Sequence, residues 1–169
     1  MSTEHKSNTE PSIRDLWRTP QWLYEYLDMF GHFDMDVAAS EVSALHPCYL
    51  TPEQDALNED TKWGERVFCN PPYSNIRPWI DQIINRQVYA HLLVPSDTSV
   101  GWWNHAYQHC AEVIFIVGRI SFVNFETGAQ INGNNKGSCV FVFDPTRQRE
   151  EPKTYVWNRD EMRKSVSLK

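Results

Sequence analysis

The pattern of apolar and polar positions predicts helices and strands that alternate along most of the chain. Residues 20–30 carry apolar side chains at helical spacing, and Thr19-Pro20 before them is typical of a helix start, with Thr as N-cap and Pro in the first turn. Gly31 is expected to end this helix. A second helix is predicted after Asn75, which could cap it, with apolar positions between residues 79 and 88, and a third is predicted over residues 101–111.

Short apolar runs rich in β-branched and aromatic residues predict the strands. They are FDMDVAAS (33–40), RVFC (66–69), HLLVP (91–95), EVIFIVG (112–118), SCVFVFDP (138–145) and an edge strand, KTYVW (153–157). Because strands and helices alternate as far as residue 118, the pattern predicts an α/β fold with a doubly wound sheet and flanking helices. Such sheets bind ligands at the carboxyl ends of their strands, so one crevice could hold both NPPY (70–73) and DVAAS (36–40).

Length and composition indicate one domain over residues 1–169, with residues 1–12 and 158–169 expected to be loose tails. No apolar run approaches the roughly 18 residues that a membrane span needs, and the polar start shows no secretory signal. The four cysteines are widely spaced, which favours a reduced, cytoplasmic chain and argues against a zinc site or a disulfide framework.

The net charge of −6 argues mildly against a polyanionic partner, but it is unevenly distributed. Residues 1–65 hold 4 Lys or Arg and 13 Asp or Glu, whereas residues 114–169 hold 9 Lys or Arg and 6 Asp or Glu. If a nucleic acid binds, the C-terminal third is the expected face. A mixed, solvated surface explains the charges equally well.

The segment VFCNPPYSNIRPW (67–79) carries the strongest chemical signal in the chain. Two consecutive prolines end the strand and hold Asn70 extended, so its amide and a backbone carbonyl become two fixed acceptors. Two acceptors suit an –NH2 group on a planar ring, and the Tyr73 ring can stack on that ring. Rigidity is valuable here, because a displacement of about 1 Å in an attacking atom can cost on the order of a hundredfold in rate.

NPPY after an apolar strand resembles the [D/N/S]-P-P-[Y/F/W] motif of amino-group methyltransferases that use S-adenosylmethionine. Five further blocks, in order, resemble the small phage-type DNA adenine methyltransferase (Dam-like) family over roughly residues 16–145. They are WRTPQWLYEYLDMFGHFDMDVAAS, YLTPEQDAL, LLVPSDTSVGWW, GRISFVN and NNKGSCVFVF. The resemblance implies a Rossmann-like class I methyltransferase fold, a phage or prophage origin, and therefore the host cytoplasm as the place of action.

The resemblance also implies roles for individual residues. Its catalytic motif corresponds to Asn70, Pro71, Pro72 and Tyr73, and its cofactor-binding segments to Thr19, Pro20, Asp36, Ala38, Ser40 and Asp55. Where the wider superfamily has glycines, this chain has Ala38, Ala39 and Ser40, which cannot take glycine-only conformations. The acid that binds the cofactor ribose is left open among Asp36, Glu53 and Asp55.

Several of these residues have simpler explanations. Asp34 and Asp36 could form the outer face of an edge strand, and Asp55 could be an acid at a helix N-terminus. His105 and His109 have a metal-compatible spacing, but with no third ligand nearby a polar helix face is the better account, and no metal is expected. Trp102 and Trp103 could stack on a base, but packing in the core or at its rim explains them better.

The sequence therefore predicts a DNA adenine methyltransferase that transfers a methyl group from S-adenosylmethionine to the amino group of an adenine flipped out of double-stranded DNA. Recognition is placed in the loop between GRISF and SCVFVF, where Asn and Lys side chains can bond base edges or phosphates. The expected DNA contacts are Asn132, Asn134, Asn135 and Lys136. An ordinary surface loop is the alternative reading.

Two other functions stay open at this point. The same motif could methylate RNA or a protein glutamine, which also presents a planar –NH2 group. The chain could also be a decayed methyltransferase that only binds DNA, which the intact NPPY argues against and the glycine-free DVAAS leaves open. The sequence reveals neither the recognition site nor the oligomeric state.

Overall fold

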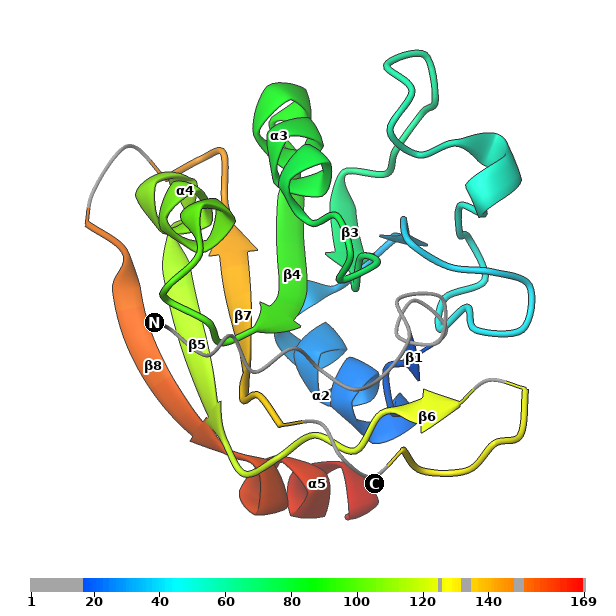
Figure 1. Ribbon diagram of the computed structural model, residues 1–169, viewed down its shortest axis with the longest axis vertical. Helices are drawn as coiled ribbons and strands as arrows, with labels where there is room; N and C mark the ends of the chain where they lie inside the picture. The colour runs from blue at the N-terminus through cyan, green and yellow to red at the C-terminus, as the bar shows by residue number, and fades with distance from the viewer. Residues whose placement is uncertain (1–16, 125, 132–134, 148–150, 169) are drawn as a thin grey trace, which may run out of the picture.

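The computed structural model describes residues 17–124, 126–131, 135–147 and 151–168. Its main sheet has six strands in the order β2-β3-β4-β7-β5-β8 (Figure 1). Five strands run in the same direction and β7 runs antiparallel to both of its neighbours. The strands are β2 (Met35–Asp36), β3 (Arg66–Cys69), β4 (Tyr89–Pro95), β5 (Glu112–Val117), β7 (Ser138–Phe143) and β8 (Lys153–Asn158).

Two apolar clusters, one on each face of the sheet, make three layers. On one face, helices α3 (Arg77–Arg86) and α4 (Gly101–His109) pack Ile80, Ile83 and Trp103 against the strands. On the other face, α2 (Gln21–Gly31) and α5 (Arg159–Ser167) contribute Leu23, Leu27 and Met162. The central strands are buried on both faces, as their continuous apolar runs predict. The predicted doubly wound α/β class is confirmed.

The predicted helix starts need correction. Thr19 does not cap α2: the N-cap position is Pro20, and the described residues make no side-chain cap hydrogen bond there. Likewise α3 begins at Arg77 with Ile76 as N-cap, so Asn75 does not cap it. The predicted end of α2 at Gly31 is confirmed, and the left-handed residue that follows is His32, with φ 49°.

The expectation of a loose C-terminal tail over residues 158–169 is also wrong. Residues 159–167 form α5, and the Asn158 side chain caps it by accepting hydrogen bonds from the backbone N–H groups of Asp160 and Glu161. Only Met162 of this helix is buried, which explains why no apolar periodicity predicted it. The predicted N-terminal tail, residues 1–12, lies outside the described residues.

A small second sheet connects the N-terminal side of the fold to the β5–β7 connection. Strand β1 (Trp17–Arg18) pairs antiparallel with β6 (Val123–Asn124), and β1 leads directly into α2. After β6 the chain turns back, because Asn124 N–H donates to the Ala129 carbonyl and Val123 bridges Gln130. The first part of the loop predicted to read DNA is therefore a tight hairpin.

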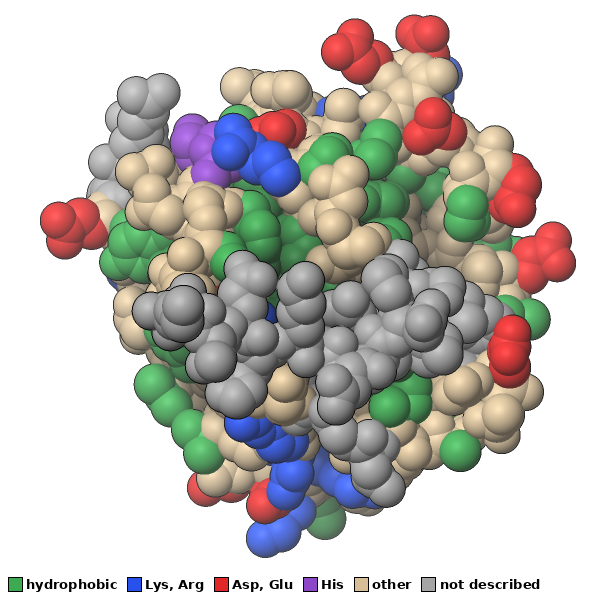
Figure 2. Space-filling view, in the orientation of Figure 1, with side chains coloured by type: hydrophobic (Ala, Val, Ile, Leu, Met, Phe, Trp, Pro, Cys, Tyr) green, Lys and Arg blue, Asp and Glu red, His purple; other side chains and the backbone are tan. Residues whose placement is uncertain are grey.

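The surface shows the charge asymmetry of the sequence. In Figure 2, Asp and Glu side chains project along the end where residues 50–65 lie, and Lys and Arg side chains gather at the end where α5 lies. Within the described part of the chain, no helix is long and apolar enough to cross a membrane.

Candidate active site

A cavity of about 280 Å³ opens at the carboxyl ends of β2 and β3, where the doubly wound fold predicts a ligand site. Its walls come from three distant parts of the chain: the β1–α2 junction, the segment after β2, and the segment after β3. Of the residues predicted to be catalytic or to bind cofactor, those that line it are Thr19, Asp36, Ala38, Ser40, Asp55, Asn70, Pro71, Pro72 and Tyr73. Pro20 is not among the lining residues; it forms the N-cap of α2.

Asn70 presents a half-satisfied amide to this cavity. Its Nδ2 donates to Thr19 Oγ1 at 2.9 Å, across 51 residues of sequence. Its Oδ1 is buried and has no hydrogen-bond partner among the described residues. Buried polar atoms are nearly always paired, so an orphan acceptor in a cavity wall is a strong indication of a ligand donor.

Tyr73 lies where the Pro-Pro segment turns away from the sheet. Its ring lines the cavity and packs edge-on against Phe122, with ring centroids 6.1 Å apart. Its hydroxyl points to the Leu93 carbonyl of β4 at 3.5 Å, the weak limit of a hydrogen bond. Burial raises the pKa of Tyr73 well above its ordinary value, so the phenol is neutral. The hydroxyl is therefore directed at β4 and not into the cavity.

Asp36 is the buried acid of the cavity, with a relative exposure of 3%. Burial raises its pKa to about 6, although backbone N–H groups of Leu45 and Ala38 donate to the carboxylate at 3.3 and 3.4 Å. A carboxylate can accept about four hydrogen bonds, so acceptor capacity is left for hydroxyl groups in the cavity. Asp36 therefore does not lie on a solvent-exposed outer face of its strand.

The segment after Asp36 needs no glycine. Ala38, Ala39 and Ser40 are absent from the described non-glycine residues with positive φ, so this turn uses conformations open to any residue. It is held by Ala39 N–H donating to the Leu50 carbonyl and by Ser40 bonding Ser43. The departure from the glycine-rich pattern is compatible with a formed cavity.

The other two candidate acids differ in position. Asp55 lines the cavity with left-handed backbone, φ 48°, directly after the short 3-10 helix η1 (Pro52–Gln54). Asp55 is therefore not an acid at a helix N-terminus. Glu53 is exposed and is not among the residues that line the cavity, whereas Asp36 and Asp55 are.

Comparisons with known proteins identify the family of this chain. The family model described as DNA N-6-adenine-methyltransferase (Dam) matches residues 6–168. The chain belongs to the Dam family. It is 35% identical over 147 residues to a DNA N-6-adenine-methyltransferase of Haemophilus phage HP1 (strain HP1c1), covering 83% of this chain and 84% of the phage protein. It is 31% identical over 168 residues to a protein of the same name from Escherichia phage T1, covering 88% and 71%.

Membership of the Dam family confirms the resemblance read from the sequence, the methyltransferase class of the enzyme, its adenine-specific DNA chemistry at family level, and a phage relationship. The mixed sheet with helices on both faces fits the class I methyltransferase fold. The roles of individual residues remain predictions. The cavity shows which of these residues lie together in one wall.

The loop predicted to contact DNA is only partly described. Asn132 and Asn134 lie outside the described residues, whereas Asn135 and Lys136 are exposed. Lys136 Nζ donates to Asp97 Oδ2 at 2.6 Å, and this bond is the main reason that the pKa of Asp97 falls to about 2. Gly137 accepts from Ser96 N–H, so the loop rejoins the sheet beside the β4–α4 connection.

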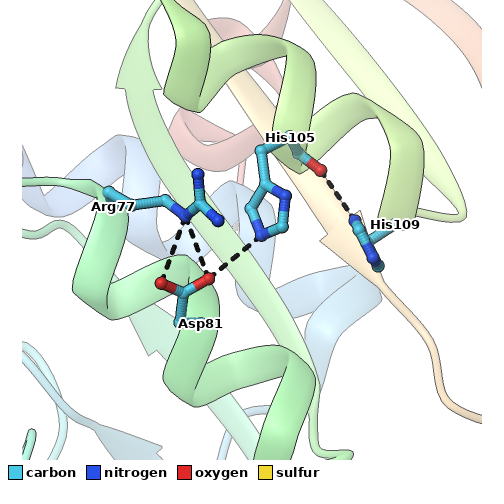
Figure 3. A network of polar contacts seen from close by, with 4 residues as sticks. All are labelled: Arg77, Asp81, His105 and His109. Atoms are coloured by element: carbon cyan, nitrogen blue, oxygen red, sulfur yellow. Dashed lines mark hydrogen bonds and ion pairs between the residues drawn. The ribbon is translucent and has the colours of Figure 1, made fainter.

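The histidine pair at metal-compatible spacing belongs to a polar network between α3 and α4 (Figure 3). His105 Nε2 bonds Asp81 Oδ1 at 3.0 Å, Arg77 Nε donates to the same carboxylate, and His109 Nδ1 donates to the His105 carbonyl. Within the residues described, no three His, Cys, Asp or Glu side chains are grouped to hold a metal ion. Trp103 packs in the core against Tyr107 and Phe141, as expected.

Sequence reasoning missed part of the cavity wall. Trp17, Arg18 and Trp79 line it, and among the described residues Arg18 is the one Lys or Arg in the cavity wall. Arg18 and Trp17 adjoin Thr19-Pro20, so their place in the sequence was the available signal. Trp79 was instead expected to face the core from its helical spacing, and it also packs against that core.

Proposed function

We propose that this protein transfers a methyl group from S-adenosylmethionine to the exocyclic amino group of adenine in double-stranded DNA, with the adenine flipped into the cavity. The observation that carries the proposal is the unpartnered Oδ1 of Asn70 in the cavity wall, next to two prolines and the Tyr73 ring. An amino group on a planar ring supplies the donor that this acceptor lacks. Family membership supports the choice of DNA and of adenine.

The lining residues fit the cofactor. Asp36 offers a buried carboxylate with free acceptor capacity for ribose hydroxyls, and Ala38 and Ala39 leave room for close approach. When bound, S-adenosylmethionine supplies a methyl group on a positively charged sulfur. The chain's own part is to hold the adenine amino nitrogen: Asn70 Oδ1 and a backbone carbonyl of the Asn-Pro-Pro segment accept its hydrogens. These two bonds make the nitrogen more tetrahedral and more electron-rich.

Tyr73 completes this arrangement by stacking on the flipped base, which fixes the direction in which the nitrogen points. The new N–C bond replaces the S–C bond, and the nitrogen then loses one proton to solvent. No general base is assigned, because the amino nitrogen is neutral before transfer and has a surplus proton to lose only after the methyl group has been added.

We further propose that the loop entered through β6 contacts the DNA around the target, with Asn132, Asn134, Asn135 and Lys136 as the contacts. The hairpin that starts the loop is paired to β1, which lines the cavity, so the loop starts beside the proposed target site. Lys136 must then exchange Asp97 for a phosphate or a guanine. If it neutralises one phosphate, Lys136→Ala should lower the salt slope of DNA binding by about one unit.

The test of the proposed function is uptake of label from S-adenosylmethionine. The purified protein is incubated with the labelled cofactor and with unmethylated DNA, RNA or a protein extract, and the DNA is then digested to nucleosides. Label in N6-methyldeoxyadenosine is the expected result. Label in RNA or in protein glutamine would replace DNA as the substrate, and no label anywhere would favour a module that only binds DNA.

A further inference from the structure

The bond between Thr19 and Asn70 has a use that neither helix capping nor cofactor binding explains. Thr19 is buried, with a relative exposure of 2%, and its hydroxyl oxygen accepts the Asn70 Nδ2 hydrogen bond. We infer that Thr19 is a positioning residue, which fixes the amide of Asn70 so that Oδ1 faces the cavity. The inference rests on the proposed function, because that function requires an acceptor at this point.

An asparagine amide has two orientations that differ by a half-turn and have nearly the same shape. With Nδ2 on Thr19, the cavity receives an acceptor that can bond an amino group. With the amide reversed, the cavity would receive an –NH2 group, which can only donate and would oppose the amino group of adenine. The structure has the first orientation, in which the Thr19 hydroxyl holds the amide through Nδ2 and leaves Oδ1 for the cavity.

The Thr19 hydroxyl is available for this role because α2 does not use it. The backbone N–H groups of Leu23 and Tyr24 donate to the Pro20 carbonyl, and no side chain caps the helix. Thr is β-branched and has few χ1 choices, so its hydroxyl stays in place. On its two sides in sequence, the Arg18 backbone is held in the β1–β6 pair and Pro20 has a fixed φ of −59°.

The decisive variant is Thr19→Val, which keeps the shape of the side chain and removes the hydroxyl. We expect kcat for DNA methylation to fall roughly five- to tenfold, the size of one neutral hydrogen bond, with the cofactor Kd unchanged. Thr19→Ser, which restores the hydroxyl, should recover most of that loss. Thr154→Val makes the same chemical change on the exposed edge strand β8 and serves as the matched control.

A double-mutant cycle separates positioning from a general structural effect. In the Asn70→Ala background the amide is gone, so adding Thr19→Val should cost nothing further. A full additional loss in that background would overturn the inference, as would a Thr19→Val enzyme with normal kcat and weakened cofactor binding, which would assign Thr19 to the cofactor alone.

A measurement that needs no activity keeps the inference distinct from the proposed function. In ¹⁵N-labelled wild type, the Asn70 side-chain NH2 signal, identified by its loss in Asn70→Ala, should show slowed hydrogen exchange, and Thr19→Ser should retain it. Fast exchange in the wild type would overturn the inference even if the enzyme methylates DNA. Slow exchange without DNA methylation would reject the proposed function and retain the bond that orients the amide.

Discussion

Two groups of polar side chains lie over the same sheet and differ in how completely they are hydrogen-bonded. In the α3–α4 network, the Asp81 carboxylate is shared by Arg77 and His105. At the cavity, Asn70 bonds Thr19 through one end of its amide and leaves the other end buried without a partner. The network resembles a functional site by its spacing of histidines, but its bonds are made within the protein. At the cavity, Trp17, Arg18 and Asn70 each carry a buried polar atom with no partner among the described residues, and a ligand could supply those partners.

Of the substitutions in the two regions, Asn70→Ala should have the largest effect on the rate of methyl transfer. Removing the orphan acceptor should lower the rate of methyl transfer by about a hundredfold, the usual cost of one oriented polar partner, equivalent to about 3 kcal/mol. Cofactor binding should change little, and the free energy of unfolding should fall by about 1 kcal/mol, because the Nδ2 bond to Thr19 is lost as well. Steady-state kinetics with calorimetric titration of the cofactor measure both, and near-wild-type turnover would remove Asn70 from the catalytic site.

Substitutions of Tyr73 distinguish the contribution of its ring from that of its hydroxyl. Tyr73→Ala should lose about 1–3 kcal/mol of base stacking, or roughly 5- to 150-fold in kcat/KM, whereas Tyr73→Phe should retain most activity. The hydroxyl contact at 3.5 Å to Leu93 is too long to contribute much. The two variants are compared on the same DNA. An equal loss in both would show that the hydroxyl matters and that stacking is the wrong account.

Asp36 predicts opposite pH effects on binding and on stability. The ionised carboxylate is the better acceptor, so cofactor affinity should weaken by on the order of tenfold as the pH falls through about 6. The folded-state pKa lies above the ordinary value of 3.8, so the native state holds the extra proton between about pH 4 and 6. Stability of the free protein should therefore decrease as the pH rises through that window.

Asp36→Asn is the variant that tests both effects. It should remove the pH dependence of cofactor binding below pH 7, lower the affinity at pH 7, and flatten the pH dependence of the stability of the free protein between about pH 4 and 6. Titration calorimetry and thermal unfolding between pH 5 and 8 are the measurements. If affinity is unchanged at every pH, Asp55, the other acid in the cavity wall, takes the ribose role.

The smallest effect is expected in the α3–α4 network. Asp81→Asn should cost about 0.5 kcal/mol of stability, because the carboxylate and its arginine partner are both largely exposed, and kcat should be unchanged. Chemical unfolding and the methylation assay give the two numbers. A large loss of activity would mean that the network, despite its internal bonds, takes part in binding the substrate.

The sequence predicted the fold class well because buried strands leave a continuous apolar signal, as in Ser138–Phe143. It failed at helix α5, which buries Met162 alone, although Asn158 with Glu161 three residues later is the start of a helix-capping pattern. It also misplaced Thr19 as a cap, since the partner that takes its hydroxyl is Asn70, far away in sequence. Capping rules consider only residues that are near one another in sequence, so they cannot predict such a bond. The motif residues were found because their chemistry is local, whereas Arg18 was missed because its place beside Thr19-Pro20 was the one signal that the sequence offered for it.

The measurement that tests the central claim most directly is the single-turnover rate of methyl transfer by two variants of nearly the same size, Asn70→Asp and Asn70→Leu. Asp keeps an acceptor oxygen in the cavity and can still bond the Thr19 hydroxyl, whereas Leu offers no acceptor. With cofactor and DNA saturating, we expect Asn70→Asp to stay within about tenfold of wild type and Asn70→Leu to fall by about a hundredfold or more. Equal rates in the two variants would contradict the claim that Asn70 works by accepting a hydrogen bond from the amino group of adenine.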